Sequence, residues 1–364
     1  MPDPRGKLLL LPQNRIWRTY TGGRTLDTLA GAPDPSDSHF AEDWIGSVTE
    51  SLIPGRDQPG EGLSTVLVGG QAHQLRALIA ANPAYYLGAQ HVAAFGPHPM
   101  LLVKFLDSAI RLHFQCHPSR AFARARLGSP SGKTEAYHIL GVREGVAEPY
   151  FYMGFQHPPA PAELKRMILE QDIAAMERCF EKLPARPGDT FLIPGGFPHA
   201  LGEGVFMIEI QEPTDFAVRY EFDRGGCVLP EAARFMGRDV DFALEMIDAT
   251  ARPLAEIERD YRCLPTREAE LGPGSYTDTL IGPDKTPCFC VKKTTLAAPV
   301  LRASGGSFHI GIVTSGVCEV SVGGETLRLR RYDKYFLPAG LEATRFTPLG
   351  GPAEILECHP PIAS

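Results

Sequence analysis

The segment from Gly188 to His199, with the sequence GDTFLIPGGFPH, restricts the fold more than any other part of the chain. Gly188 and Asp189 have turn composition, and the apolar residues that follow read as a short strand. The Pro-Gly-Gly run at 194–196 then turns the backbone a second time. This geometry predicts a strand that delivers His199 to the mouth of a small β-barrel.

The chain contains a second copy of this segment. Residues 333–343 (DKYFLPAGLEA) align without gaps on residues 189–199, so the strand and the Pro-x-Gly turn occur twice. Ala343 stands where the first copy has His199. Because the fold needs the strand and turn in both copies but the histidine in only one, we interpret His199 as a ligand and expect the C-terminal copy to be free of metal.

Three further polar residues are expected to meet His199. Gln115 and His117 are two positions apart on a predicted strand and therefore share a face, and Glu135 opens a later strand. Two imidazoles, one amide oxygen and one carboxylate suit Zn²⁺ with an open coordination position, while Fe²⁺, Mn²⁺ and Co²⁺ also accept such ligands. The sequence predicts one metal ion per chain, held by Gln115, His117, Glu135 and His199.

Length and composition set the class of protein. A chain of 364 residues exceeds one typical domain, and 43% hydrophobic with 22% charged residues is ordinary for a globular protein. The net charge of −7 and the scattered cations argue against nucleic acid as a partner. No N-terminal apolar run is long enough for a signal peptide or a membrane span. The eight dispersed cysteines are expected to be free thiols, as in a cytoplasmic protein.

Periodicity divides the chain into a mainly β fold with helical insertions. Apolar spacing predicts helix at about 70–90, a helical insert at about 158–184 and a helical segment at 228–262. Strands and turns are read over residues 1 to about 65, over 100–153, after the insert up to about 222, and from Phe289 onward. We therefore expect a catalytic domain over 1–227, including the insert, and a C-terminal domain over 263–364.

The spacing of the segment at 188–199 resembles the second metal motif of the cupin superfamily. More narrowly, the chain is similar to the type I phosphomannose isomerases through five motifs in register. These are LLVKFLD at 101–107, QCHP at 115–118, KTE at 133–135, the His199 segment, and IEI at 208–210 leading to Asp215, Arg219 and YEFDR at 220–224.

This resemblance implies a bicupin, with two β-barrel or jelly-roll domains of which the C-terminal one is degenerate. It implies a metal-dependent enzyme of carbohydrate metabolism that interconverts mannose 6-phosphate and fructose 6-phosphate, a sugar phosphate as its small-molecule partner, and a monomer or homodimer. It also strengthens the assignment of Gln115 as a ligand, because the family uses glutamine at this place.

Isomerisation of an aldose to a ketose needs a base and a stabiliser of negative charge on oxygen. Arg219 is the leading candidate for charge stabilisation because it is always cationic, and Lys133, Glu209 and Asp215 are the alternatives for the base. Lys104, with Lys133, is expected to flank the pocket, in a family role of substrate binding or proton transfer. Glu209 also reads as a residue that orients a ligand or pairs with a lysine.

One departure from the family pattern leaves the substrate open. His113 stands where the family often has a serine that contacts phosphate. The imidazole could replace the hydroxyl as an anion contact, or fill the phosphate pocket and favour an unphosphorylated sugar. An isomerase of a different sugar, a cupin dioxygenase and a non-catalytic sugar-binding bicupin are the competing hypotheses.

Overall fold

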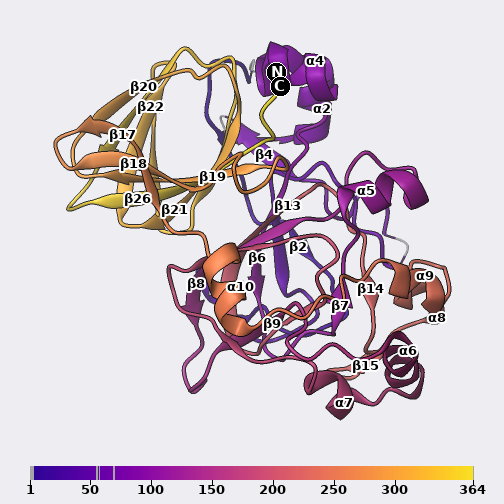
Figure 1. Ribbon diagram of the computed structural model, residues 1–364. Helices are drawn as coiled ribbons and strands as arrows, with labels where there is room; N and C mark the ends of the chain where they lie inside the picture. The colour runs from indigo at the N-terminus through magenta and orange to yellow at the C-terminus, as the bar shows by residue number, and fades with distance from the viewer. Residues whose placement is uncertain (1–3, 55, 57, 69, 364) are drawn as a thin grey trace.

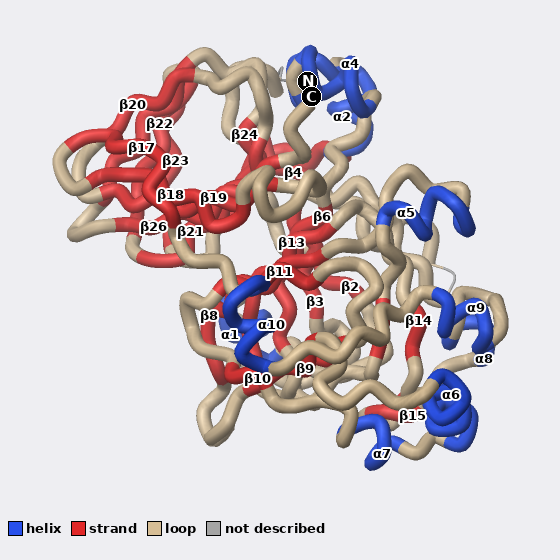
Figure 2. The backbone as a smooth tube through the Cα atoms, in the orientation of Figure 1, coloured by secondary structure: helices blue, strands red, loops and turns tan. Residues whose placement is uncertain are grey.

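The computed structural model describes residues 4–54, 56, 58–68 and 70–363. The chain is mainly β, as predicted, with short helices at the edges of the sheets (Figures 1 and 2). Its strands form two units, each made of two sheets that share a core. Among the described residues, no helix has the length and apolar content needed to cross a bilayer. The predicted domain limits at residues 1 and 364 lie outside the described residues.

The N-terminal unit pairs a six-stranded with a five-stranded antiparallel sheet. Apolar side chains from both sheets meet in one buried cluster that includes Leu106, Tyr137, Phe151 and Leu201. The first sheet has the order β11 (Thr190–Ile193), β8 (Glu135–Val142), β13 (Val205–Gln211), β6 (Leu102–Asp107), β3 (Glu42–Ile45) and β2 (Arg15–Ile16). The second has the order β10 (Leu183–Pro184), β9 (Tyr150–Met153), β12 (His199–Leu201), β7 (Gln115–Cys116) and β14 (Val218–Arg219).

The C-terminal unit repeats this arrangement, and its two sheets share a cluster that includes Val313, Leu329 and Phe346. The smaller sheet has the order β20 (Val300–Ala303), β25 (Ala343–Pro348), β22 (Val317–Val322) and β23 (Glu325–Arg330). The larger one has the order β17 (Thr266–Gly272), β18 (Ser275–Ile281), β19 (Cys290–Leu296), β26 (Ala353–His359), β21 (His309–Ser315), β24 (Lys334–Leu337), β1 (Leu9–Leu10), β4 (Thr65–Val68) and β5 (Gln71–Gln74).

The two units are joined by the N-terminal strands. β1 pairs with β24, so that residues near the start of the chain extend the sheet of the C-terminal unit. A continuous core cluster runs through this junction and contains Leu9, Phe105, Phe308 and Phe336. The relative placement of the units therefore depends on buried apolar contacts as well as on chain connectivity.

The helices lie at the periphery, and most follow the predicted segments. The predicted helix at 70–90 is divided at Asn82, whose side chain accepts from the Tyr85 amide while Pro83 opens the next helix. The helical run at 120–127 escaped prediction. The helices are α1 (Arg24–Leu29), α2 (Leu75–Ala81), α3 (Pro83–Leu87), α4 (Ala89–Phe95), α5 (Arg120–Phe122), the π-helix η1 (Ala123–Leu127), α6 (Pro161–Glu170), α7 (Ile173–Glu177), α8 (Glu231–Arg234), α9 (Val240–Glu245) and α10 (Leu254–Tyr261). A two-stranded ribbon, β15 (Asp223–Arg224) with β16 (Cys227–Val228), precedes α8.

Candidate metal centre and its surroundings

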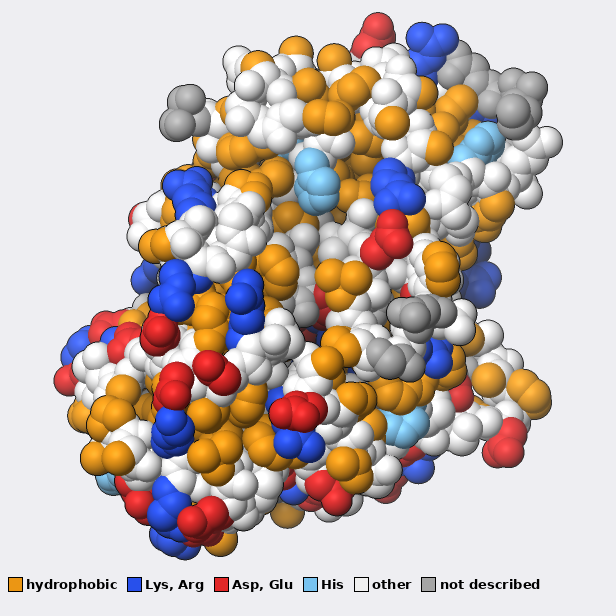
Figure 3. Space-filling model, turned by 90° about the vertical axis from the view of Figure 1, so that its right-hand side faces the viewer, with side chains coloured by type: hydrophobic (Ala, Val, Ile, Leu, Met, Phe, Trp, Pro, Cys, Tyr) orange, Lys and Arg blue, Asp and Glu red, His pale blue; other side chains and the backbone are white. Residues whose placement is uncertain are grey.

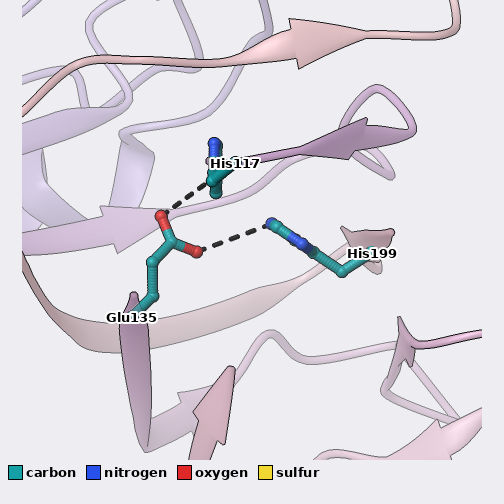
Figure 4. Close-up of side chains that lie close together, drawn as sticks. All are labelled: His117, Glu135 and His199. Carbon is teal, nitrogen blue, oxygen red and sulfur yellow. Dashed lines mark ion pairs between the residues drawn. The ribbon is translucent and has the colours of Figure 1, made fainter. Parts of the chain in front are cut away.

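Three of the four predicted ligands converge between the sheets of the N-terminal unit (Figure 4). Nε2 of His117 lies 3.2 Å from Oε1 of Glu135, and Nε2 of His199 lies 3.5 Å from Oε2 of the same carboxylate. The three side chains are each 1% exposed. Their ligand atoms all lie within 4.8 Å of one another, which is close enough for one ion to contact all three.

Backbone pairing explains this convergence. β12 pairs with β7 so that His199 faces Gln115, and β11 pairs with β8 so that Ile193 faces Glu135. His117 follows two residues after Gln115. Three separate segments, at 115–117, 135 and 193–199, thus meet at one place because the two sheets close over each other.

The Pro-Gly-Gly turn also ties the two histidine segments together. The Gly196 amide donates to the His117 carbonyl at 2.7 Å. A Cβ at Gly195 would lie 2.6 Å from the Pro118 carbonyl oxygen, and Gly196 has a φ of +98°, a left-handed conformation that favours glycine. Both glycines are therefore needed for the close approach that places His199 beside His117.

Both histidines direct Nε2 at the centre and use Nδ1 for a hydrogen bond. Nδ1 of His117 lies 2.8 Å from the Phe216 carbonyl oxygen, and Nδ1 of His199 lies 2.9 Å from that of Phe197. Each Nδ1–H donates to its carbonyl, which leaves the Nε2 lone pair directed at the centre. Burial lowers the pKa of both imidazoles, and the nearby Lys133 ammonium lowers them further. Neutral imidazoles with fixed tautomers and a buried carboxylate fit a divalent transition metal.

Gln115 borders the same centre. Its Nε2 lies 3.3 Å from Nε2 of His199. Oxygen and nitrogen of a side-chain amide occupy nearly the same positions when the amide is turned over, so this group can direct its oxygen at the centre. The position therefore suits the predicted fourth ligand.

A cluster of buried charges surrounds the ligands. Nζ of Lys133 lies 2.7 Å from Oε1 of Glu135 and 3.0 Å from Nε2 of His117. Nζ of Lys104 lies 3.0 Å from Oε1 of Glu209, and Glu209 lies 4.0 Å from Lys133. Burial raises the pKa of Glu209, as does the charge of Glu135. Burial is the largest influence on Glu135 as well and opposes its ionisation, but Lys133, His199, Glu209 and Lys104 together outweigh burial and hold that pKa at about 2.

Arg219 links this cluster to the surface. It faces Gln115 across the β14–β7 pair, and its guanidinium donates to the Ala233 carbonyl at 3.2 Å. It lines a small inner cavity together with Lys104, His113 and Lys133. It also lines a groove of about 760 Å³ that continues along residues 50–54, 56, 58, 59, 232, 233 and 236–238. Figure 3 shows this face of the molecule, which is hollowed near its centre.

Two other predicted site residues, His113 and Asp215, already form hydrogen bonds with other groups of this chain. Both ring nitrogens of His113 face backbone carbonyls, those of Glu221 at 2.9 Å and Thr19 at 3.2 Å. Burial, with the charge of Arg219, lowers its pKa to about 4. Asp215 accepts from the Arg18 guanidinium at 3.0 and 3.1 Å and from the Leu52 amide at 3.2 Å, so both oxygens of its carboxylate are already engaged.

Sequence reasoning missed Arg18, Tyr20 and Glu42, which lie beside the site. Glu42 accepts from the indole of Trp44 at 2.6 Å and from the hydroxyl of Tyr20, and it lies 3.3 Å from Arg18. The sequence signal that could have pointed to Glu42 is its charge at the start of the otherwise largely apolar segment at 42–48. Strand pairing brings these three residues to the site, and the sequence pattern does not show that pairing.

Comparison with solved structures defines the class of fold. Mannose 6-phosphate isomerase from Bacillus subtilis superimposes with a TM-score of 0.72 over 96% of this chain and 99% of that one, at 21% identity. A variant of phosphomannose isomerase from Salmonella typhimurium gives a TM-score of 0.69 over 98% and 100%, at 16% identity. The fold is therefore that of the phosphomannose isomerases.

The sequence points to the same relatives. The chain is 28% identical to a mannose-6-phosphate isomerase from Streptococcus mutans over 282 residues, which cover 76% of this chain and 80% of that protein. It is 33% identical to a probable mannose-6-phosphate isomerase from Bacillus subtilis over 125 residues, or 38% of that protein. No protein-family model matches the chain. The chain is thus a homologue of the mannose-6-phosphate isomerases, which confirms the resemblance drawn from its motifs.

Proposed function

We propose that this protein is a metal-dependent aldose–ketose isomerase that interconverts mannose 6-phosphate and fructose 6-phosphate. The observation that carries the proposal is the convergence of His117, Glu135 and His199 on one point, next to Lys133 and Arg219. The relatives named for this activity support the same assignment. One Zn²⁺ at this centre is our preferred cofactor, and Fe²⁺, Mn²⁺ and Co²⁺ suit the same donors.

The reaction moves one proton between C1 and C2 and a second between the oxygens on these carbons, through an enediol or enediolate. A bound divalent cation supplies charge stabilisation to the developing oxyanion. We assign the carbon-to-carbon proton transfer to Glu209 and Lys133, which lie together beside the ligands. Asp215, the third alternative for the base, is better placed as the partner of Arg18.

The substrate reaches Glu209 and Lys133 through the groove that Arg219 lines. Arg219 is always cationic and stands where the inner cavity meets the groove, so it suits the stabilisation of negative charge on the substrate. Lys104 and His113 line the inner cavity and remain predicted substrate contacts. An unphosphorylated sugar is the alternative substrate, because His113 replaces the hydroxyl that the family often uses.

We further propose a bicupin organisation, supported by the similar order of strands in the two units. The eight cysteines are all unpaired thiols, which supports an intracellular site of action. A monomer or a homodimer is compatible with this assignment, and nothing in the charge distribution calls for a nucleic acid partner.

The decisive experiment is a coupled assay with mannose 6-phosphate beside free mannose, on protein whose metal content is measured. Chelation, His117→Ala and His199→Ala should each lower the rate at least about 1,000-fold, since a direct ligand contributes more than the 10–100-fold of an outer-shell partner. His157→Ala serves as the matched control because that imidazole is exposed and its ion pair is with the exposed Glu181. An unchanged rate in His117→Ala would end the proposal, and turnover of mannose alone would redirect it to the unphosphorylated sugar.

A further inference from the structure

The two units repeat each other strand by strand. In the N-terminal unit the order β11, β8, β13, β6, β3 matches the order β24, β21, β26, β19, β18 of the C-terminal unit. The repeated segments at 189–199 and 333–343 place β11 and β24 in correspondence. The pairing registers then assign an equivalent position to each residue in the neighbouring strands.

The ligand Glu135 has a histidine as its counterpart. Ile193 pairs with Glu135 in the N-terminal unit, and the equivalent Leu337 pairs with His309 in the C-terminal unit. His309 therefore occupies the position of a predicted metal ligand, although the C-terminal unit lacks a histidine at 343.

The charged pair next to Glu135 is also repeated. Glu209 pairs with Lys104 on its neighbouring strand, and Glu357 pairs with Lys292 at the equivalent place. Two residues further along β26 lies His359, whose counterpart on β13 is Gln211. The C-terminal unit has thus kept a carboxylate and a lysine and gained two histidines.

The counterparts of the other ligands are small. Gln115 pairs with His199, whereas Ala303 pairs with Ala343. The loss of these side chains leaves a cavity of about 290 Å³, whose walls include Ala303, Ser304, His309, Leu337 and His359. The histidines of the C-terminal unit therefore face open space rather than packed hydrocarbon.

His309, Glu357 and His359 form a second convergent cluster. Their ligand atoms all lie within 4.8 Å of one another, and Nε2 of His359 lies 3.4 Å from Oε2 of Glu357. Glu357 is fully buried and His309 is 6% exposed. Within the described part of the chain, Nε2 of His309 is buried without a hydrogen-bond partner, and Nε2 of His359 has its contact with Glu357 but no hydrogen bond. A buried nitrogen without a partner costs free energy unless something binds it.

The cations beside the cavity are already paired. Arg302 forms a two-point ion pair with Glu357, one contact being 3.1 Å long, and the Thr294 hydroxyl donates to the same carboxylate at 2.8 Å. Lys292 pairs with Glu268 at 2.5 Å. An anion would have to compete with these carboxylates, whereas the two imidazole nitrogens are available to a cation.

We propose that the C-terminal unit binds a divalent transition metal through the imidazoles of His309 and His359 and the carboxylate of Glu357. Its remaining coordination positions open into the cavity. Imidazole with carboxylate is a donor set for Zn²⁺ and its first-row neighbours. The Arg302 guanidinium shares the carboxylate and lowers the affinity of this site for a cation, as Lys133 does at the N-terminal centre. On this proposal the chain takes up two metal ions, in contrast to the metal-free second domain expected from the sequence.

Cobalt binding to the full-length apoprotein tests this site. In a His117→Ala, His199→Ala background, where the N-terminal centre is disabled, Co²⁺ should still bind at one equivalent and give a visible d–d absorption band. Adding His309→Ala should abolish that band and that equivalent. Adding His157→Ala instead should leave both unchanged.

The same titration contains the results that would overturn the proposal. Absence of the Co²⁺ equivalent in the doubly substituted background refutes it, as does an equivalent that survives His309→Ala. A melting temperature that rises with inorganic phosphate but not with Co²⁺, and no longer rises in Arg302→Gln, would show an anion site instead. If His309→Ala fails to fold, His359→Gln replaces it, since His359 lies at the end of β26. Isomerase activity plays no part in these readouts, so a failure here leaves the proposed function untouched.

Discussion

Nζ of Lys133 lies 2.7 Å from Oε1 of Glu135, which places a buried ammonium among the predicted metal ligands. The same nitrogen lies 3.0 Å from Nε2 of His117. A lysine this close would repel a bound divalent ion, and under the proposed function it also takes part in proton transfer to the substrate. Affinity for metal and competence for catalysis therefore oppose each other at this residue.

Replacing Lys133 should separate these two effects. In Lys133→Gln we expect tighter metal binding, because the repelling charge is gone, together with a fall in kcat of about 100-fold or more. Competition against a chromophoric chelator measures the affinity, and the coupled assay measures kcat. Weaker metal binding in the variant would show that the ammonium supports the centre instead of competing with it.

The buried pair of Arg18 with Asp215 should act on stability. Removing one partner of a buried pair costs about 3–5 kcal/mol when the remaining charge is uncompensated, and Glu42, 3.3 Å from Arg18, reduces that cost here. We expect Asp215→Asn to lower the urea midpoint while the metal content is retained. The double variant Arg18→Met, Asp215→Asn is the control and should recover part of the loss. A stable Asp215→Asn protein with no turnover would instead identify Asp215 as the base.

Arg219 should affect turnover without affecting metal content. Its guanidinium is held by the Ala233 carbonyl and faces both the inner cavity and the groove. Arg219→Lys keeps the charge but loses the planar donor array, so we expect a drop in kcat of about 100-fold, as on removal of an oxyanion-stabilising donor. Metal analysis of the same preparation provides the check. Loss of metal together with loss of activity would place Arg219 among the supports of the centre.

Because Gly195 packs closely against Pro118, we expect a larger residue at this position to disturb the metal centre. A methyl group there would lie 2.6 Å from the Pro118 carbonyl oxygen and equally near the Cα of Ser119. Gly195→Ala should therefore push the His199 turn away from His117, cost about 1–3 kcal/mol, and weaken metal binding. Gly141→Ala is the matched control, because nothing lies within 4 Å of its added methyl. Equal metal affinity in the two variants would contradict this account.

His138 should make stability depend on pH. Burial, and to a smaller extent the charge of Lys293, lowers its pKa from 6.5 to about 4. The unfolded chain therefore takes up a proton at this site below pH 6.5, whereas the folded protein resists protonation until about pH 4. Stability is retained above the higher value and is lost as the pH falls through this window, by at most about 3 kcal/mol.

Comparison of the wild type with His138→Asn isolates this contribution. Asparagine can keep the contact that Nδ1 of His138 makes with the Thr190 hydroxyl at 2.9 Å, but it does not titrate. Urea midpoints measured between pH 6.5 and 4 should fall less steeply in the variant. Parallel curves for the two proteins would show that His138 is protonated in the folded state as readily as in the unfolded one.

Local patterns predicted much of the fold and most of the centre. The turn at 194–196 needs glycine at 196 because of its left-handed backbone, so the strand and the position of His199 could be read from the segment alone. The need for glycine at 195 comes instead from the approach of Pro118 and was not visible in the segment. The alternation of Gln115 and His117 likewise follows from strand geometry. The helical run at 120–127 and the hairpin of β17 and β18 escaped prediction, because short elements depend more on packing than on propensity.

Long-range pairing decided the rest. The sequence by itself determined that two copies of a strand-and-turn segment exist and that His199 is present in only one. Only the tertiary structure brought Arg18 and Glu42 to the site, paired Asp215 with Arg18, and set His309, Glu357 and His359 around one point. The physical reason is register: antiparallel pairing selects which residues of distant strands face each other, and no local pattern in either strand records that choice.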